Sequence, residues 1–252
     1  MVGTYPVACG VPRSHFTMRV IHWSSGASVT VRAVLLDAFG TLLRMEPPAP
    51  VLTALLADAG FPLDEQRVSD ALALEIRHYR LRMQLGRDPE GLAALRAECA
   101  GVLVDALGPG APPIPLATDL LVESLRFHLF DDVLPTLDLL DDMGLVLGVV
   151  SNWDCALPQH LARLGVADRF GVIVASAAVG YRKPDPGIFT TALSALGTAP
   201  ADALHVGDRR AEDLDGARAA GLQALLLDRA LQVEAADDVI TTLAQIPGRI
   251  AT

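Results

Sequence analysis

Cysteine is scarce in this sequence, because Cys9, Cys99 and Cys155 are the only three among 252 residues. They are odd in number and widely spaced, so they match neither a disulfide framework nor a zinc-ligand pattern. Proteins without disulfides are typical of reducing compartments. We therefore expect a cytoplasmic protein.

Long apolar runs are also missing. No stretch of the sequence reaches the roughly 20 apolar residues that a helix needs to cross a bilayer. The N-terminus lacks the basic start and unbroken apolar segment of a signal peptide. Residues 1–30 instead mix Gly, Pro, Ser and His with small apolar residues, without a clear period. We expect a poorly ordered N-terminal extension over these residues.

Positive charge is in deficit, with 20 Lys and Arg against 30 Asp and Glu and a formal net charge of -10. Nucleic acids and anionic membranes favour a basic surface, so neither is an expected partner. A small phosphorylated molecule stays compatible with this charge, because a metal ion and a few local cations can make one cleft positive. The composition is 51% hydrophobic and 20% charged, which excludes a disordered chain and allows a sizeable core.

Short apolar runs alternate with segments of helical period from Val31 onward. This alternation is typical of an α/β fold, so we expect a Rossmann-like parallel sheet with helices on both faces. The predicted strands are VRAVLL, LVLGVV, VIVASA, ALHVG and QALLLD, at 31–36, 145–150, 172–177, 203–207 and 223–228. The predicted helices between and after them are 134–143, 156–165, 187–197, 211–220 and 235–245.

One long stretch interrupts the alternation. Between 48 and 131 we find no convincing strand, and the Pro-rich segment 47–50 marks its start. We expect an all-helical domain over 48–131, inserted into a hydrolase core formed by 31–47 and 132–252. Its predicted helices are 50–59, 64–85, 89–107 and 116–129.

Polar residues stand at the ends of four predicted strands. Asp37 follows the first strand, Ser151 and Asn152 follow the second, Lys183 lies in the loop after the third, and Asp208 follows the fourth. Ligands of open parallel α/β sheets bind at the carboxyl ends of the strands, so these side chains should converge. Carboxylates favour a hard cation such as Mg²⁺, and hydroxyl and ammonium groups bind phosphate oxygens.

The same positions carry a family resemblance. DAFGTL at 37–42, SNWD at 151–154, RKPDPGIF at 182–189 and GDRRAED at 207–213 resemble, in order, the four motifs of the haloacid dehalogenase-like hydrolase superfamily. Each motif alone is a weak signal, but four in order at four strand ends are specific. The helical insertion after the first motif resembles the mobile helical cap of this family.

The resemblance implies a hydrolase in which Asp37 is the nucleophile and forms an aspartyl-phosphate that water then attacks. Lys183 would neutralise charge on Asp37 and on the transferring phosphoryl group. Thr41 would bind phosphate or orient Asp37. Gly40 would allow the tight turn that brings backbone N–H groups near the anion, and Ser151 would bind a phosphoryl oxygen.

The resemblance also implies a Mg²⁺ site. Its ligands would be the carboxylates of Asp37 and Asp208 and the backbone carbonyl of Phe39. Asp213 would lie behind them and orient Lys183 or a metal-bound water.

Three further polar residues of the motifs have expected roles. Asn152 would shape its loop or contact substrate. Arg209, beside the expected cleft, would contact an anionic substrate. Asp185 would cap the helix that Pro186 begins.

The sequence departs from the family pattern at Phe39. Phosphatases of this family usually carry a second Asp there, which protonates the leaving group and activates water. Such general acid–base help is worth about 10²–10⁴-fold. An alkyl phosphate should therefore be a poor substrate, whereas acyl and aryl phosphates leave more readily. His78 in the helical insertion is a conceivable substitute acid, although a lone His on an amphipathic helix usually has a structural role.

Three functions remain open at this stage. The first is a Mg²⁺-dependent phosphatase that acts on a small phosphorylated metabolite. The second is a 2-haloacid dehalogenase, for which Phe39 is harmless because halide leaves without a proton; the retained Asp208 argues for a metal and against this alternative. The third is a weakly active protein that binds a phosphorylated ligand. The pattern is compatible with a monomer or a homodimer.

Overall fold

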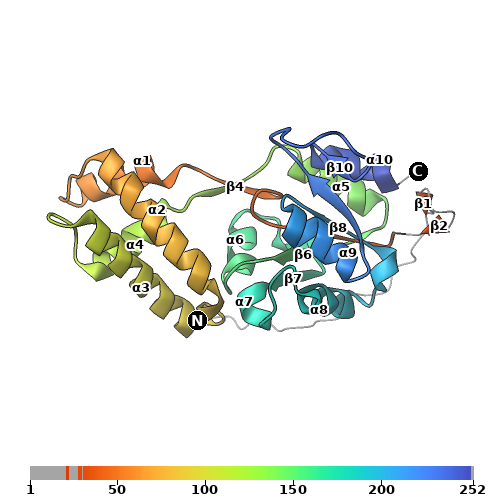
Figure 1. The fold of residues 1–252 in the computed structure, drawn as a ribbon, viewed down its shortest axis with the longest axis horizontal. Helices are drawn as coiled ribbons and strands as arrows, with labels where there is room; N and C mark the ends of the chain where they lie inside the picture. The colour runs from red at the N-terminus through yellow and green to blue at the C-terminus, as the bar shows by residue number, and fades with distance from the viewer. Residues whose placement is uncertain (1–20, 23–27, 30, 251–252) are drawn as a thin grey trace.

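The computed structural model describes residues 21–22, 28–29 and 31–250 (Figure 1). The expectation of an extension over 1–30 falls mostly outside these described residues. Within that segment, β1 (Ile21–His22) and β2 (Ser28–Val29) form one antiparallel pair. The described chain is elongated, with a helical unit at one end and a sheet covered by helices at the other.

The sheet is parallel throughout, as the strand–helix alternation predicts. Its strands run in the order β10-β9-β8-β3-β6-β7, which confirms the predicted α/β class. The short β10 was missed, because two residues carry no usable pattern and pairing with β9 stabilises them. The strands are β3 (Ala33–Leu36), β6 (Val146–Ser151), β7 (Val172–Ala175), β8 (Ala203–Gly207), β9 (Gln223–Leu227) and β10 (Val239–Ile240).

Helices cover both faces of the sheet and bury two hydrophobic clusters. Along β3, Val34 and Leu36 join one cluster while Ala33 and Leu35 join the other, as the two-residue period of a strand requires. The first face packs against α5 (Val133–Asp142), α6 (Leu157–Arg163) and α10 (Ile246–Ile250). The second packs against α8 (Pro186–Leu196) and α9 (Gly216–Ala219). The short α7 (Ser176–Val179) follows β7 directly.

The predicted helix over 235–245 is wrong. Residues 229–238 contain no regular helix, β10 follows, and a single 3₁₀ turn covers Leu243–Gln245. The segment has the small and acidic residues of a surface helix, but the sheet edge beside β9 offers its two adjacent β-branched residues backbone hydrogen bonds and burial. Tertiary pairing overrides local propensity here.

Four helices with their own core form the helical unit: α1 (Pro48–Asp58), α2 (Glu65–Arg82), α3 (Pro89–Leu107) and α4 (Ile114–Ser124). Asp64 and Asp88 accept backbone hydrogen bonds at the N-termini of α2 and α3, which is the usual role of an N-cap carboxylate. The apolar faces of the helices meet in a separate hydrophobic cluster that includes Leu56, Leu72 and Leu103.

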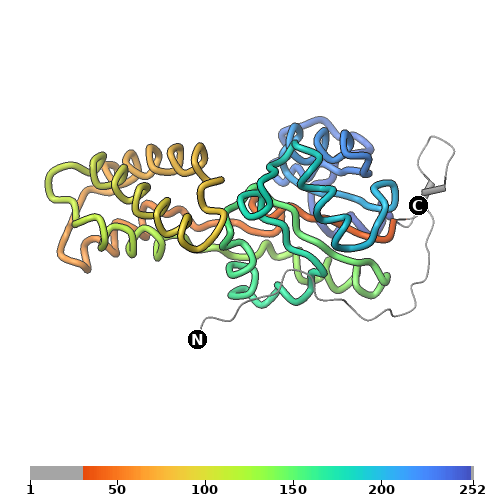
Figure 2. Tube along the Cα trace, turned by 90° about the horizontal axis from the view of Figure 1, so that it is seen from below, coloured from red at the N-terminus to blue at the C-terminus, as the bar shows by residue number. Residues whose placement is uncertain are grey.

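Two linkers connect the helical unit to the sheet, and they lie side by side (Figure 2). β4 (Leu43–Met45) in the first linker pairs antiparallel with β5 (Phe127–Leu129) in the second. The expectation of a continuous helix over 116–129 is therefore wrong at its end, because α4 stops at Ser124. A strand this short is stabilised by a partner far away in sequence, which periodicity does not reveal.

The helical unit also contacts the sheet domain directly. The hydroxyl of Tyr79 on α2 donates to Asp154 Oδ2 at 2.7 Å, and the Cys155 N–H donates to the Gly86 carbonyl at 2.8 Å. These contacts join the end of α2 to the loop after β6. None of the helices within the described chain is long and apolar enough to cross a membrane.

Candidate active site

The register of the central strands brings the motif residues together. Leu36 at the end of β3 pairs with Val149 on β6 and with Val206 on β8, and the Asp37 N–H donates to the Val206 carbonyl at 2.9 Å. Asp37 therefore emerges between the ends of the two neighbouring strands. Asp208 follows one of them and Ser151 ends the other, as predicted from the strand ends.

Lys183 is the buried cation of this site, with 1% of the residue exposed. Its Nζ donates to Asp37 Oδ1 at 2.6 Å and to Asp213 Oδ1 at 2.5 Å. Asn152 holds the lysine backbone at both ends, accepting from the Lys183 N–H at 2.8 Å and donating to its carbonyl at 3.0 Å. Asn152 thus shapes this loop.

Asp185 caps α8 as predicted, accepting from the Gly187 N–H at 2.7 Å.

The buried charges determine one another's pKa values. Burial alone lowers the pKa of Lys183, but the charges of Asp37 and Asp213 outweigh it and raise that pKa. Burial raises the pKa of Asp213, and the charge of Lys183 with a hydrogen bond from His205 reverses this and lowers it well below its usual range. Burial also raises the pKa of Asp37, and Lys183 only partly offsets that rise. With the same ammonium group as neighbour, the pKa of Asp213 is lowered while the pKa of Asp37 stays raised.

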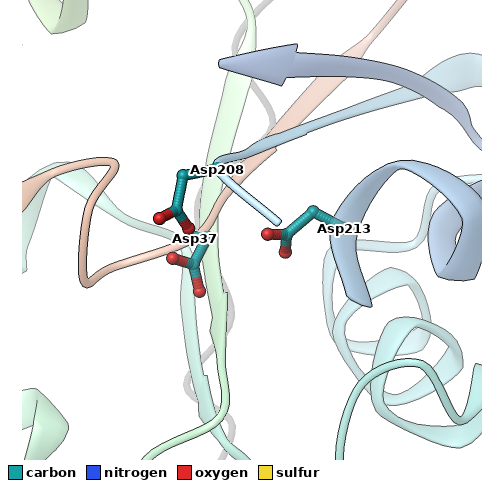
Figure 3. Close-up of side chains that lie close together, drawn as sticks. All are labelled: Asp37, Asp208 and Asp213. Atoms are coloured by element: carbon teal, nitrogen blue, oxygen red, sulfur yellow. The ribbon is translucent and has the colours of Figure 1, made fainter. Parts of the chain in front are cut away.

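Asp37, Asp208 and Asp213 form an acidic cluster, in which one oxygen of each lies within 4.8 Å of the others (Figure 3). Among the described residues, the buried Asp208 Oδ1 has no hydrogen-bond partner. Burial, and then the charges of the other two carboxylates, raise the pKa of Asp208 to about 6. A divalent cation would supply both the missing partner and the missing positive charge. This donor set therefore fits a hard metal ion.

Two glycines allow the backbone to approach these carboxylates. Gly40 has a φ of 87°, and a Cβ on it would lie 2.3 Å from Asp208 Oδ2. A Cβ on Gly207 would lie 2.2 Å from the Asp213 carboxyl carbon. Any larger residue at either position would displace a carboxylate of the cluster.

The remaining predicted site residues surround Asp37. Ser151 Oγ donates to Asp37 Oδ1 at 2.9 Å. The Thr41 hydroxyl is buried and has no hydrogen-bond partner in the described chain. The Arg209 N–H donates to Asp213 Oδ2 at 2.9 Å, while its side chain is exposed. Arg209 thus contributes its backbone to the site.

Phe39 joins an aromatic cluster beside the site. Its ring makes edge contacts with Phe127 on β5 and with Trp153, at centroid distances of 6.5 and 6.3 Å, and His160 on α6 packs against both of those rings. Phe39 itself is 38% exposed. His78, by contrast, lies in the helical unit and is paired with Glu98 at 2.8 Å, as expected for a structural histidine.

Two residues of the site were missed from the sequence. His205 on β8 is fully buried, and its Nε2 lies 3.0 Å from Asp213 Oδ1. A histidine inside the apolar run ALHVG was the available signal. Glu212 accepts from Asn152 Nδ2 at 3.1 Å, within a π-helical turn (Arg210–Asp215). Irregular turns of this kind have no periodic signature, although they are frequent at functional sites.

Comparisons with known proteins agree with this arrangement. Residues 31–221 match the haloacid dehalogenase-like hydrolase family, and the chain belongs to it. It is therefore a hydrolase, as the four motifs imply, and the acidic cluster at the strand ends could hold a metal ion.

Similar proteins include some named as phosphatases and some named as dehalogenases. A phosphoserine phosphatase of Thermus thermophilus is 30% identical over 232 residues, which cover 81% of this chain and 91% of the relative. The haloacid dehalogenase-like hydrolase domain-containing protein 3 of Danio rerio is 31% identical over 214 residues, covering 80% and 86%. The structure of a 2-haloacid dehalogenase from Pseudomonas syringae pv. Tomato superposes with a TM-score of 0.63 at 26% identity, covering 88% of this chain and 98% of that one.

Proposed function

We propose that this chain is a Mg²⁺-dependent phosphatase that acts on a small phosphorylated metabolite through an aspartyl-phosphate at Asp37. The observation that carries the proposal is the buried Asp208 Oδ1, which lacks a hydrogen-bond partner among the described residues and belongs to a cluster with Asp37 and Asp213. Displacement of a halide needs no metal, whereas transfer of a phosphoryl group benefits from one. Relatives named as phosphatases, including that of T. thermophilus, support the same choice.

Asp37 would attack the phosphorus through Oδ2. Within the described chain both hydrogen bonds to its carboxylate, from Ser151 and Lys183, reach Oδ1, which leaves Oδ2 free to react. As the Oδ2–P bond forms, the bond from phosphorus to the leaving oxygen breaks, and that oxygen keeps the electron pair and takes a proton from solvent. A water then attacks phosphorus, the Oδ2–P bond breaks with its electron pair returning to Asp37, and a proton of the water passes to solvent as inorganic phosphate leaves.

The residues around the nucleophile would hold charge during these steps. Lys183 would offset negative charge on Asp37 and on the phosphoryl oxygens, and Asp213 would keep the lysine in place. Mg²⁺ would be held by Asp37, Asp208 and the Phe39 carbonyl, and when bound it supplies positive charge beside the phosphoryl group. Thr41, whose buried hydroxyl has no hydrogen-bond partner among the described residues, would donate to a phosphoryl oxygen.

Phe39 would restrict the substrate class. It supplies no proton to the leaving group, so we propose a preference for acyl or aryl phosphates, whose leaving groups are stable as anions.

Residues 48–131 would act as a cap that closes over the core formed by 31–47 and 132–252, excluding water from the reaction. The Tyr79–Asp154 hydrogen bond would be one contact of the closed form.

A 2-haloacid dehalogenase is the second candidate function, and Phe39 favours it. Asp37 would then attack the carbon that bears the halogen, and halide would leave without a proton. The similarity to the dehalogenase of P. syringae, at 26% identity, points the same way. Asp208 would have no role in that reaction, and for this reason we rank it second.

A hydrolase screen distinguishes these functions. The purified protein would be assayed with p-nitrophenyl phosphate, acetyl phosphate, several sugar phosphates and 2-chloropropionate, each with Mg²⁺ and with EDTA, and with Asp37→Asn as the control. Phosphate release that requires both Mg²⁺ and Asp37 supports the phosphatase. Chloride release that is insensitive to EDTA contradicts it and selects the dehalogenase. Inactivity on every substrate favours a protein that binds a phosphorylated ligand.

A further inference from the structure

Arg229 follows β9, outside the four family motifs, and its side chain contacts three separate residues. Its Nη1 and Nη2 donate to the two Asp132 carboxylate oxygens at 3.0 and 2.9 Å. Nη2 also donates to the Thr41 carbonyl at 2.8 Å. The guanidinium carbon lies 3.9 Å from the centroid of the Phe130 ring. One side chain thus makes a bidentate ion pair, a backbone hydrogen bond and a cation–π contact.

These three partners lie where the two linkers of the helical unit meet the core. Thr41 lies just before β4 in the first linker, while Phe130 and Asp132 lie just after β5 in the second. The linkers also meet here directly, because the Phe130 N–H donates to the Leu42 carbonyl at 3.1 Å. Arg229 therefore contacts the chain on both sides, near the point where each linker leaves the core.

We infer that Arg229 is a positioning residue, which fixes the turn carrying the nucleophile and anchors both linkers to the core. Arg229 would affect catalysis through its contact with Thr41, which lies in the turn after Asp37. The turn after Asp37 is compact, since the Leu42 and Leu43 N–H groups both donate to the Ala38 carbonyl. Arg229 Nη2 donates to the carbonyl of Thr41 in that turn, and the Thr41 hydroxyl is one of the buried groups without a hydrogen-bond partner in the described chain.

The surroundings favour an arginine at this position. Asp132 is oriented by Thr242 Oγ1 at 2.6 Å and by the Leu243 N–H at 2.9 Å, so its two oxygens present a fixed face to the guanidinium. The side chains of Arg229 and Asp132 are 21% and 17% exposed, so water screens the pair only partly. A planar fork of donors can contact Asp132 and Thr41 together, whereas a lysine ammonium is a single point of charge.

Arg169 provides a matched control. It pairs with Asp138 at 2.9 Å and with Asp141 at 2.6 Å, both on α5, the helix that Asp132 immediately precedes. Its side chain is 27% exposed, close to the value for Arg229. The side-chain hydrogen-bond partners of Arg169 in the described chain lie on α5 and in neither linker. Arg169→Gln therefore removes an arginine–aspartate ion pair on the neighbouring helix without touching the proposed anchor.

The test compares wild type with Arg229→Gln, Arg229→Lys and Arg169→Gln by hydrogen–deuterium exchange of the full chain. We expect exchange in residues 41–46 and in residues 126–131 to accelerate about tenfold in both Arg229 variants, the size expected for a lost charge-assisted hydrogen bond. Arg169→Gln should leave both segments unchanged. Unchanged exchange, acceleration in one linker alone, or equal acceleration in Arg169→Gln overturns the inference. Arg229→Lys keeps the positive charge, so it provides the test if Arg229→Gln does not fold.

Kinetics separate positioning from mere stabilisation. This arm rests on the proposed phosphatase function, with p-nitrophenyl phosphate as the probe. We expect kcat of Arg229→Gln to fall about tenfold with a smaller change in KM, while Arg169→Gln keeps both constants. An unchanged kcat in a variant with loosened linkers overturns the positioning role. If wild type releases no phosphate, the proposed function fails, and the exchange data still decide whether Arg229 anchors the linkers.

Discussion

Lys183 Nζ lies 2.6 Å from Asp37 Oδ1 in a site where only 1% of the lysine and 6% of the aspartate are exposed. The two residues come from loops after β3 and β7, far apart in sequence, and the same ammonium also binds Asp213. The cation is therefore part of the site's charge balance as well as a candidate catalytic group.

Lys183→Met should destabilise the fold as well as abolish turnover. It leaves Asp37 and Asp213 buried without their counter-ion, and removal of one partner of a buried ion pair typically costs about 3–5 kcal/mol. Urea unfolding would measure the free energy of unfolding. Adding Asp213→Asn to Lys183→Met removes one of the stranded charges and should recover part of the loss. A Lys183→Met protein as stable as wild type would contradict this account.

Gly40→Ala should disturb the metal site, whereas Gly60→Ala should not. Both glycines have positive φ, 87° and 88°, so each alanine should cost about 1–2 kcal/mol of backbone strain. A Cβ at Gly40 would also meet Asp208, while a Cβ at Gly60 meets nothing within 4 Å. We expect weaker Mg²⁺ binding by calorimetry and lower phosphatase activity in Gly40→Ala alone. Equal effects of the two substitutions on Mg²⁺ binding would refute the close approach as the cause.

Phe39→Asp should create the acid that the first motif lacks. With alkyl phosphates we expect the rate to rise, up to the about 10²–10⁴-fold that general acid–base catalysis typically contributes. With aryl phosphates the gain should be smaller, because their leaving groups need less protonation. Phe39→Leu is the control, since it removes the aromatic contacts with Phe127 and Trp153 without adding an acid. The absence of any gain in Phe39→Asp would favour the dehalogenase or the ligand-binding alternative.

Asp132→Asn should reduce the sensitivity of the fold to acid. Burial alone raises the pKa of Asp132, but hydrogen bonds from Arg229, Thr242 and Leu243 outweigh it and lower that pKa in the folded state. A carboxyl with a lowered folded pKa adds stability above its unfolded pKa of about 3.9 and loses it as the pH falls through the folded pKa. Denaturant unfolding between about pH 6 and pH 3 should therefore show a steeper loss in wild type than in Asp132→Asn. Parallel curves for the two proteins would show that the shift has no thermodynamic weight.

Much of the site could be predicted because polar residues at strand ends carry a local signal. Asp37, Asp208 and Ser151 each follow an apolar run, and the parallel sheet then forces those ends to one edge. His205 could have been predicted too, as a polar residue inside a buried strand. The aromatic cluster of Phe39, Phe127 and Trp153 could not be predicted. Phe39 and Trp153 lie in the loops after β3 and β6, Phe127 lies on β5, and the three positions share no sequence period.

The sequence by itself determined the α/β class, the inserted helices and the four motifs, since apolar period and turn residues are local properties that folding preserves. Only the tertiary structure decided which short segments became strands, as in β5 and β10, because two or three residues are stabilised by their partners and not by their own pattern. It also decided that Lys183 contacts two carboxylates, that Asp208 Oδ1 has no hydrogen-bond partner among the described residues, and that Arg229 contacts both Thr41 and Asp132. Those properties depend on burial and on distances between residues far apart in the chain, and sequence spacing encodes neither.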